Sequence, residues 1–433
     1  MAKKSAVGVF GLWHLGCVLS AAWSSKKCRV IGFDYDESLI QKLKQSEPPI
    51  FEPNLKETLK KNMRQKTLSF TADIAQLKEC DYVFLSYDTP VLDNDGSDLT
   101  PLERAIDDLG KVLKKGALVI VSSQTPVGTC GDFRETLKSA NASLDLVYSP
   151  ENLRLGEAIH NYLNPGRIIL GSEDKTAEKK ALELFKLIPA KVLSMNLESA
   201  EMVKHGINAF LAMSIAFTNE LSDLCEKTGA DILDVVKGMK SDPRIGEKAY
   251  LSPGIGFSGG TLGRDLKVLE SVDASQAKGN FFGEIHARNR TRKHTVISRL
   301  KTLLPNGAGA KGQRIGVLGL TYKPGTSTLR RSLPVEIVRE LQKVYSQISV
   351  FDPKADFSQW SGEKGFTIAS SAEKLVKESD AVLILTEWPE FKTLRWSAAL
   401  RKSCPQIIYD AKNCLIDLSL SKMGYRYVRI GRN

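Results

Sequence analysis

The chain has 433 residues, 42% of them hydrophobic, and a formal net charge of +11. This length predicts two or three domains, and the apolar fraction is typical of globular proteins rather than of membrane or disordered ones. Seven cysteines without C-x-x-C spacing argue against a disulfide framework and against a metal site and favour a reducing, cytoplasmic location, while the scattered charge argues against nucleic acid as a partner.

The first 35 residues predict a strand, a glycine turn, a helix and a second strand. They begin like a signal peptide, but glycines at 8, 11 and 16 break the apolar run, so we expect neither a leader nor a membrane span. The turn "GLWHLG" keeps two of the three glycines of a dinucleotide-binding G-x-G-x-x-G, with Trp13 in place of the second. Asp34 ends the second strand, where a carboxylate accepts from the adenosine ribose and favours NAD over NADP. The expected NAD-binding residues of this segment are Gly11, Leu12, Leu15 and Asp34.

Short apolar runs alternate with amphipathic helical patterns up to about residue 190, which predicts a parallel, doubly wound α/β sheet. The clearest helical patterns between the strands are Ser38–Lys44 and Leu102–Leu113. The predicted strands are Ala6–Phe10, Arg29–Phe33, Tyr82–Ser86, Leu118–Ser122, Leu144–Tyr148 and Arg167–Leu170.

From Leu197 the pattern changes to a helix of about thirty residues that contains no proline and ends at a glycine suited to a C-cap. Because this helix is apolar on more than one side, we expect it to be buried in a helical middle domain or against a partner subunit, and we expect a homodimer formed through it. Further helices are predicted at about Ile232–Lys240 and Gly283–Leu304, followed by a glycine-rich linker, Leu304–Gln313.

After the linker the β–α alternation resumes and repeats the beginning of the chain. "VGVFGLWHLG" followed by "VIGFDYD" is matched by "IGVLGLTYKPG" followed by "ISVFDPK". We therefore predict two Rossmann-like, doubly wound domains, 1–196 and 304–433, joined by a helical domain, 197–303. The predicted strands of the last domain are Arg314–Leu318, Ile348–Phe351, Ala381–Leu385, Ile407–Tyr409 and Tyr427–Ile430.

Several short strings, in this order along the chain, carry a resemblance to a known family: "PIFEPNL", "SYDTPVLDNDGSDL", "SSQTPVGT", "SPENLRLGEA", the segment Met202–Glu220, "DPRIG", "GFSGGTLGRD", "GLTYKPGTSTLRRS", "VFDPKA" and "LTEWPEF". From end to end the chain resembles the UDP-glucose/GDP-mannose dehydrogenases. The resemblance implies an enzyme that oxidises a primary alcohol of a nucleotide sugar, through aldehyde to carboxylate, with two NAD. It also implies that the first domain binds NAD, the middle domain dimerises and the last domain holds the nucleotide of a nucleotide-diphosphate sugar, with UDP favoured.

The resemblance implies five catalytic positions, and Thr261 occupies the one where the family has its nucleophile. Lys204 and Asn208 share one face of the long helix and would stabilise the alkoxide and oxyanion during hydride transfer. Glu151 would act as a base through water, and Asp265 would help to activate water.

The resemblance also implies further ligand contacts. Arg264, Thr89, Gln124 and Arg330 would contact the cofactor, although Arg264 stands at a lysine position and Gln124 at a threonine position. Arg244 would reach a neighbouring subunit's site. The implied substrate-binding residues are Arg244, Tyr250, Gly254, Phe257, Lys323 and Lys412.

Departures from the family pattern gather at the nucleophile and on the cofactor side. The family loop carries a cysteine that forms a thioester, and this chain has Thr261 there, whose hydroxyl is a poor nucleophile without a dedicated base. Two interpretations of Cys130 and Cys225 stay open: one of them approaches this loop in space and replaces the missing thiol, or both are buried small hydrophobic residues. The remaining departures are Trp13, Leu155 for a glutamate, Ser327 and Thr328 for an acidic pair, and Lys412 for an arginine.

Three functions stay open at this stage. The first is a two-electron NAD-dependent oxidation of a sugar hydroxyl, since the hydride-transfer groups are kept and the thiol is lost. The second is a four-electron 6-dehydrogenase in which Asp265 and Glu151 hold the water that hydrates the aldehyde. The third is a catalytically silent, nucleotide-sugar-binding homologue, which Trp13 favours.

Overall fold

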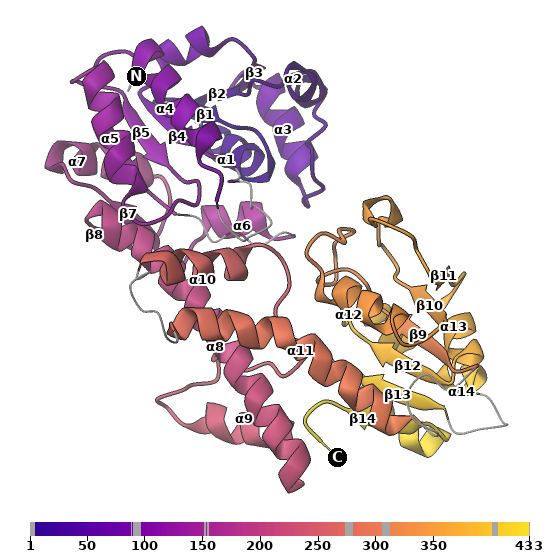
Figure 1. Cartoon of the computed structure of the whole chain (residues 1–433). Coiled ribbons are helices and arrows are strands. Elements are labelled where there is room, and N and C mark those ends of the chain that lie inside the picture. The colour runs from indigo at the N-terminus through magenta and orange to yellow at the C-terminus, as the bar shows by residue number, and fades with distance from the viewer. Residues whose placement is uncertain are drawn as a thin grey trace. The chain divides into compact units, whose positions relative to one another are not determined.

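The computed structural model describes residues 5–87, 89, 97–150, 153, 156–272, 280–304, 312–400 and 406–432. The chain divides into two compact units, Met1–Gly206 and Ile207–Asn433 (Figure 1). None of the helices in these ranges is both long enough and apolar enough to cross a membrane.

The first unit contains an eight-stranded sheet in the order β3-β2-β1-β4-β5-β6-β7-β8, which confirms the predicted doubly wound fold. The pairs are parallel except for β6 and β7, which pair antiparallel at Tyr148 and Gly171. Strands β3 and β8, at the two edges of the sheet, were not predicted, because serine and threonine interrupt the apolar run in β3 and the residues of β8 are only partly buried or exposed. The strands are β1 (Ala6–Phe10), β2 (Arg29–Phe33), β3 (Leu68–Thr71), β4 (Tyr82–Leu85), β5 (Leu118–Val121), β6 (Asp145–Tyr148), β7 (Ile168–Gly171) and β8 (Val192–Met195).

Helices cover both faces of this sheet (Figure 1). Side chains alternate along β1, so Val7 and Val9 pack with α1, α3, α6 and α7, while Phe10 packs with α4 and α5 on the other face. The helices are α1 (His14–Ser25), α2 (Glu37–Lys44), α3 (Leu55–Arg64), η1 (Ile74–Glu79), α4 (Thr100–Val112), α5 (Thr129–Ala140), α6 (Ala158–Leu163) and α7 (Lys175–Phe185).

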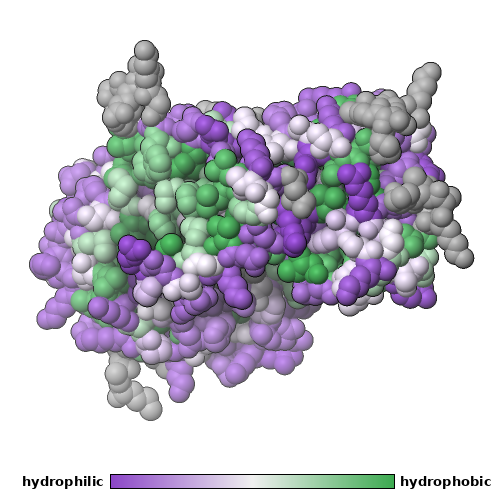
Figure 2. Space-filling view, turned by 90° about the horizontal axis from the view of Figure 1, so that it is seen from below, coloured by the Kyte–Doolittle hydropathy of each residue, from purple (hydrophilic) through white to green (hydrophobic). Residues whose placement is uncertain are grey.

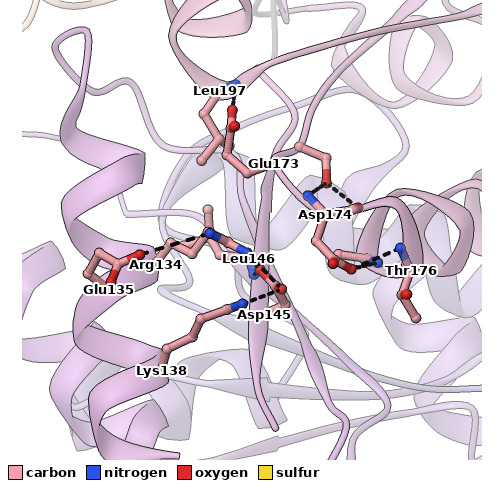
Figure 3. A network of polar contacts seen from close by, with 11 residues as sticks. Arg134, Glu135, Lys138, Asp145, Leu146, Glu173, Asp174, Thr176 and Leu197 are labelled. Carbon is pink, nitrogen blue, oxygen red and sulfur yellow. Dashed lines mark hydrogen bonds and ion pairs between the residues drawn. The ribbon is translucent and has the colours of Figure 1, made fainter. Parts of the chain in front are cut away.

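Charged side chains tie the helices to the sheet around β6 and β7 (Figure 3). Arg134 and Lys138, both on α5, converge on Asp145 of β6, with Arg134 Nε 2.7 Å and Lys138 Nζ 3.1 Å from its carboxylate oxygens. Glu173, which follows β7, accepts the backbone N–H of Leu197 at 3.0 Å. The first residue of the long helix α8 (Leu197–Thr228) is thereby anchored to the first unit.

The second unit contains the remainder of α8, further helices and a six-stranded, all-parallel sheet in the order β11-β10-β9-β12-β13-β14. One face of this sheet packs against α12 and the C-terminal half of α11, around Val296, Leu300 and Leu333. The helices are α9 (Ile232–Ser241), α10 (Thr261–Val272), α11 (Phe281–Leu303), α12 (Leu333–Gln342), η2 (Phe357–Gln359), α13 (Ala372–Glu378), η3 (Pro389–Thr393), α14 (Trp396–Ala399), η4 (Ile416–Leu418) and η5 (Leu420–Met423). The strands are β9 (Arg314–Leu318), β10 (Gln347–Phe351), β11 (Thr367–Ile368), β12 (Ala381–Ile384), β13 (Ile407–Asp410) and β14 (Arg426–Arg429).

The two sheets repeat one topology, as the internal sequence match predicted. The order β3-β2-β1-β4-β5-β6 corresponds strand for strand to β11-β10-β9-β12-β13-β14. Gly11 and Gly319 both have φ of +92°, and their N–H groups donate to the carbonyls of Phe33 and Phe351, each at 2.9 Å. The predicted boundaries coincide with the start of α8 and the end of α11, while the division into three domains stays a prediction.

The aspartate that ends the second strand differs between the two lobes in how many donors it accepts. Asp34 and Asp352 each accept, at 2.7 Å, the N–H that follows the glycine of their own turn. Asp352 accepts in addition the backbone N–H and hydroxyl of Thr321, at 3.0 and 3.1 Å, and Nε1 of Trp388, at 3.1 Å.

Candidate active site

The glycine turn after β1 has the geometry that a dinucleotide pyrophosphate requires. Gly11 has a positive φ, and a Cβ built at Gly16 would lie 1.8 Å from the carbonyl oxygen of Gly11, so only glycine allows α1 to start this close to the strand. The N-terminus of α1 has no side-chain cap, and its N–H groups are therefore available to an anion.

Trp13 stands at the middle of this turn without backbone strain. Its φ is −74°, which any residue adopts, so the turn itself does not require glycine at this position. The indole is 45% exposed. A side chain here therefore reduces only the space above the helix N-terminus, which is the space that a pyrophosphate would use.

The next residue links the turn to another part of the first unit. His14 Nε2 lies 3.0 Å from Oε2 of Glu52, a buried carboxylate that also accepts the N–H groups of Gly156 and Ala158 at 3.0 and 2.9 Å. Glu52 therefore joins the start of α1 to the start of α6. Sequence reasoning did not assign these roles to His14 and Glu52.

The remaining predicted cofactor residues of the first unit lie at the carboxyl edge of the sheet, where doubly wound proteins bind ligands. Asp34 is buried and ends β2, and Leu15 is half-buried on the first turn of α1. Thr89 Oγ1 donates to the backbone carbonyl of Gln124 at 2.7 Å, so these two predicted contacts are brought together. Glu151 and Leu155 lie outside the described residues.

Within the second unit, the predicted catalytic residues Asn208 and Asp265 are in contact. Nδ2 of Asn208, on α8, donates a hydrogen bond to Oδ2 of Asp265, which is fully buried on α10. Lys204 is buried four residues before Asn208 on the same helix, so the two lie one turn apart. Arg264 is buried beside Asp265, whereas Thr261 is the first residue of α10 and is exposed.

The backbone of the loop before α10 is held by three buried polar side chains that sequence reasoning missed. Asn289 accepts the N–H of Phe257 at 2.8 Å and donates to its carbonyl at 2.9 Å. Asn219 accepts the N–H of Gly254 at 2.8 Å, and Nε of Arg292 donates to the carbonyl of Gly254 at 3.1 Å. The available signal was a polar residue on an otherwise apolar helix face, which alone does not reveal its partner.

The predicted substrate-binding side chains are distributed unevenly over the second unit. A Cβ at Gly254 would lie 4.0 Å from Cδ of Lys412, whose Nζ pairs with Glu387 at 3.0 Å. Arg244 forms a two-pronged ion pair with Asp242 and is almost fully exposed. Of the other three predicted side chains, Tyr250 is exposed, Lys323 is half-buried and Phe257 is buried.

Arg330, predicted to contact the cofactor, lies near the end of the turn that follows β9. Its side chain is exposed, and its backbone N–H donates to Oγ1 of Thr328 at 3.2 Å.

Three segments of the chain match the three domains of one known family. Residues 5–189 match the NAD binding domain of the UDP-glucose/GDP-mannose dehydrogenase family, residues 198–290 the central domain and residues 316–417 the UDP binding domain. The chain is a member of the UDP-glucose/GDP-mannose dehydrogenase family.

Relatives and solved structures align with this family member over nearly its whole length. It is 33% identical over 432 residues to UDP-glucose 6-dehydrogenase TuaD of Bacillus subtilis, covering 98% of this chain and 93% of that protein. It is 30% identical over 436 residues to a UDP-glucose 6-dehydrogenase of Rhizobium meliloti, covering 98% and 99%. The structure of a UDP-glucose dehydrogenase from Pyrobaculum islandicum is similar, with a TM-score of 0.89, 26% identity and coverage of 100% and 99%.

Membership in the UDP-glucose/GDP-mannose dehydrogenase family makes NAD the cofactor of the first unit and oxidation of a nucleotide sugar the supported reaction class. The residues present fit NAD in three respects: the positive φ of Gly11, the close approach at Gly16, and Asp34 directly after β2. Trp13 is the feature of the turn that departs from this fit.

None of the described thiols of this dehydrogenase has the character of an activated nucleophile. Burial raises the pKa of Cys28 to about 11 and that of Cys80 to about 12. Burial and the neighbouring Glu201 hold the pKa of Cys130 well above its ordinary value, and burial also raises that of Cys225. Cys225 lies 17 residues beyond Asn208 on α8, which is about 25 Å along the helix axis.

Proposed function

We propose that this protein catalyses a single two-electron, NAD-dependent oxidation of a sugar hydroxyl on a nucleotide-diphosphate sugar. The observation that supports this most directly is the buried hydrogen bond between Asn208 and Asp265 of α10, the helix whose first residue is the exposed Thr261. The residues expected for hydride transfer are present, whereas Thr261 stands in place of the cysteine that would form a thioester.

The chain's own residues supply groups for hydride transfer. Lys204 carries an ammonium group and Asn208 an amide, and both would stabilise the negative charge that develops on the substrate oxygen. Asp265 accepts from Nδ2 of Asn208 and so fixes the direction of that amide. In the step, the substrate C–H bond breaks with its electron pair, the hydroxyl proton passes to water held by Asp265 or Glu151, and a carbonyl forms. NAD supplies the acceptor for that hydride.

Thr261 would stop the reaction at the carbonyl product. A second oxidation through a covalent adduct needs a nucleophile that adds to the aldehyde, and an aliphatic hydroxyl does so only with an adjacent base. Among the described side chains, none forms a hydrogen bond with the Thr261 hydroxyl. The proposed product is therefore an aldehyde or ketone.

Product analysis tests the electron count. The protein is incubated with NAD and a panel of nucleotide sugars, with UDP-sugars first, and NADH and product mass are measured together. One NADH per sugar and a mass loss of two hydrogens are expected. Two NADH and a uronate would instead support the four-electron alternative, in which water held by Asp265 and Glu151 hydrates the aldehyde.

A silent binding homologue is the second candidate, and Trp13 is the observation that favours it. An exposed indole above the N-terminus of α1 competes for the volume that a pyrophosphate occupies. Calorimetric titration with NAD separates the two candidates, since saturable binding together with turnover excludes the silent one.

We also propose a homodimer formed through α8. Phe210, Phe217 and Leu224 recur every seven residues on this helix and are 60%, 48% and 54% exposed. Figure 2 shows hydrophobic side chains gathered on one face of the molecule. Apolar side chains at heptad spacing suit a second copy of the same helix.

The described cysteines are all free, which supports the proposed cytoplasmic location.

A further inference from the structure

Glu201 is a fully buried carboxylate on the second turn of α8, and it faces the turn between β5 and α5. Its two oxygens accept the N–H of Gly128 at 2.6 Å, the N–H of Cys130 at 2.9 Å and the hydroxyl of Thr125 at 3.1 Å. A buried carboxylate is costly unless such donors surround it. All of these contacts lie within the first unit.

These contacts give α5 a cap that its own sequence does not provide. The N-cap residue of α5 is Gly128, with φ of +95° and no side chain to accept the first N–H groups. Glu201 accepts two of them and brings a negative charge to the positive end of the helix dipole. Through this carboxylate the start of α5 and the second turn of α8 are fixed to each other.

A second contact joins the same two segments. Nε2 of His205, one turn after Glu201, lies 2.8 Å from the carbonyl oxygen of Thr125, which can only accept, so Nε2 is the donor. Successive turns of α8 therefore bind one β5–α5 turn. Lys204 lies between Glu201 and His205 in the sequence, on the same stretch of helix.

The same turn belongs to the predicted cofactor site. Gln124 precedes Thr125, and its carbonyl accepts from Thr89 Oγ1. Gln124 and Thr89 are both predicted cofactor contacts. The β5–α5 turn therefore contacts a predicted cofactor residue, Thr89, and also the helix that carries Lys204.

We propose that Glu201 is a positioning residue that couples the cofactor-side turn to the helix carrying Lys204, so that bound NAD fixes the place of Lys204. This inference rests on the proposed function for the role of Lys204. Glu201 itself is fully buried, and the hydrogen bonds of its carboxylate described above are all to protein groups.

The chain provides a matched control for a structural role. Glu173 also accepts a backbone N–H at a helix N-terminus of the first unit, that of Leu197 on α8, but it does not contact the β5–α5 turn. E201Q and E173Q therefore each weaken an anchor of the same helix. Only E201Q weakens the link to the cofactor side.

The experiment measures amide hydrogen exchange in wild type, E201Q and E173Q, with and without NAD. NAD should slow exchange in peptides covering residues 197–206 at least fivefold in wild type and in E173Q, and less than twofold in E201Q. The NAD Kd values of the three proteins should agree within threefold. Single-turnover hydride transfer to NAD from the nucleotide sugar that the wild type oxidises should be at least tenfold slower in E201Q, with the steady-state KM unchanged, and should stay within twofold of wild type in E173Q.

The outcomes separate this inference from the proposed function. Equal NAD-dependent slowing in wild type and E201Q, or none in wild type, overturns the inference, and so does hydride transfer in E201Q at the rate of E173Q. A wild type that shows the NAD-dependent slowing but oxidises no nucleotide sugar contradicts the proposed function and supports the coupling. If E201Q does not fold, Thr125→Val removes one of the three donors and should give a smaller loss in the same direction; no loss would overturn the inference.

Discussion

The side-chain amide of Asn208 donates a hydrogen bond to the carboxylate of Asp265, which joins α8 to α10 inside the second unit. Because Asp265 is fully buried, its charge acts in a medium that screens it poorly. This hydrogen bond uses one of the two N–H groups of the Asn208 amide. The amide oxygen and the second N–H can therefore contact other groups.

Asp265→Asn should lower kcat about 100-fold, because the neutral amide oxygen that replaces the carboxylate is a weaker acceptor and orients the Asn208 amide less firmly. The NAD Kd should change less than threefold. Steady-state kinetics and calorimetry check the two values, with Asp234→Asn on the exposed side of α9 as the control. A kcat within threefold of wild type would contradict the role given to this pair.

Trp13→Gly should tighten NAD binding about tenfold, which corresponds to about 1.4 kcal/mol. The substitution restores space above the N-terminus of α1, and the φ of −74° means that the turn keeps its shape without the indole. Calorimetric titration measures the change. Phe281→Ala, which removes an exposed aromatic ring from the second unit, serves as the control. Weaker binding in Trp13→Gly would show that the indole contacts the cofactor favourably.

Gly256→Ala should disrupt the loop that carries Phe257. Gly256 has φ of +105°, and a Cβ there would lie 2.4 Å from Oδ1 of Asn289. The strain should cost about 1–3 kcal/mol of unfolding free energy, and the displaced loop should raise the KM for the nucleotide sugar more than the KM for NAD. Gly325→Ala has a positive φ but open space around it, so it should reproduce only the backbone strain. Equal effects of the two variants would contradict the clash.

Asp145→Asn should destabilise the first unit at neutral pH and have little effect in acid. Burial alone raises the pKa of Asp145, but hydrogen bonds from Arg134 and Lys138 outweigh it and hold the pKa below the ordinary value. A depressed pKa means that this stabilisation is present above the unfolded pKa of about 3.9 and is lost as pH falls through the folded value.

We therefore expect Asp145→Asn to lower the unfolding free energy by about 1–3 kcal/mol at pH 7 and by less at pH 3. Urea unfolding at both pH values measures the difference. Glu135→Gln removes an exposed partner of Arg134 and should change stability by less than about 0.5 kcal/mol. A loss that is the same at both pH values would contradict the charge-based account.

Phe217→Glu should convert the proposed dimer to monomer, because dimerisation would then bury a carboxylate without a partner. Sedimentation or light scattering across a range of concentrations measures the oligomeric state. Lys227→Glu, an exposed charge change near the end of α8, should leave it unaltered. A Phe217→Glu variant that stays dimeric would place the interface elsewhere.

Much of the fold followed from local patterns. The strands of both lobes were predictable because buried parallel strands are short apolar runs between turn residues, and α8 because no proline interrupts it. Strand β8 was not predictable, since its residues are half-exposed and alternate weakly.

Residues of the candidate site could be named from the sequence where motifs are contiguous, and their roles stay predictions, whereas partners from distant segments could not be named. Lys204 and Asn208 follow from helical spacing together with the family strings. The roles of Asn289 and Glu201 depend on which backbone groups lie opposite them, 32 residues away at Phe257 and 71 residues away at Cys130. Hydrogen bonding across such separations is set by tertiary packing, which no local sequence window contains.

The duplicated turn of the second lobe has a consequence for cofactor stoichiometry. The Oδ2 atom of Asp352 accepts from the Leu320 N–H, from both donors of Thr321 and from Trp388, while Oδ1 accepts the N–H groups of Lys354 and Ala355 at 2.9 Å each. A carboxylate with six donors has no lone pair left for a ribose hydroxyl. In the second lobe, the aspartate at the position of a ribose acceptor is fully occupied by internal hydrogen bonds. We therefore expect each polypeptide to bind one equivalent of dinucleotide, although it has two Rossmann-like sheets.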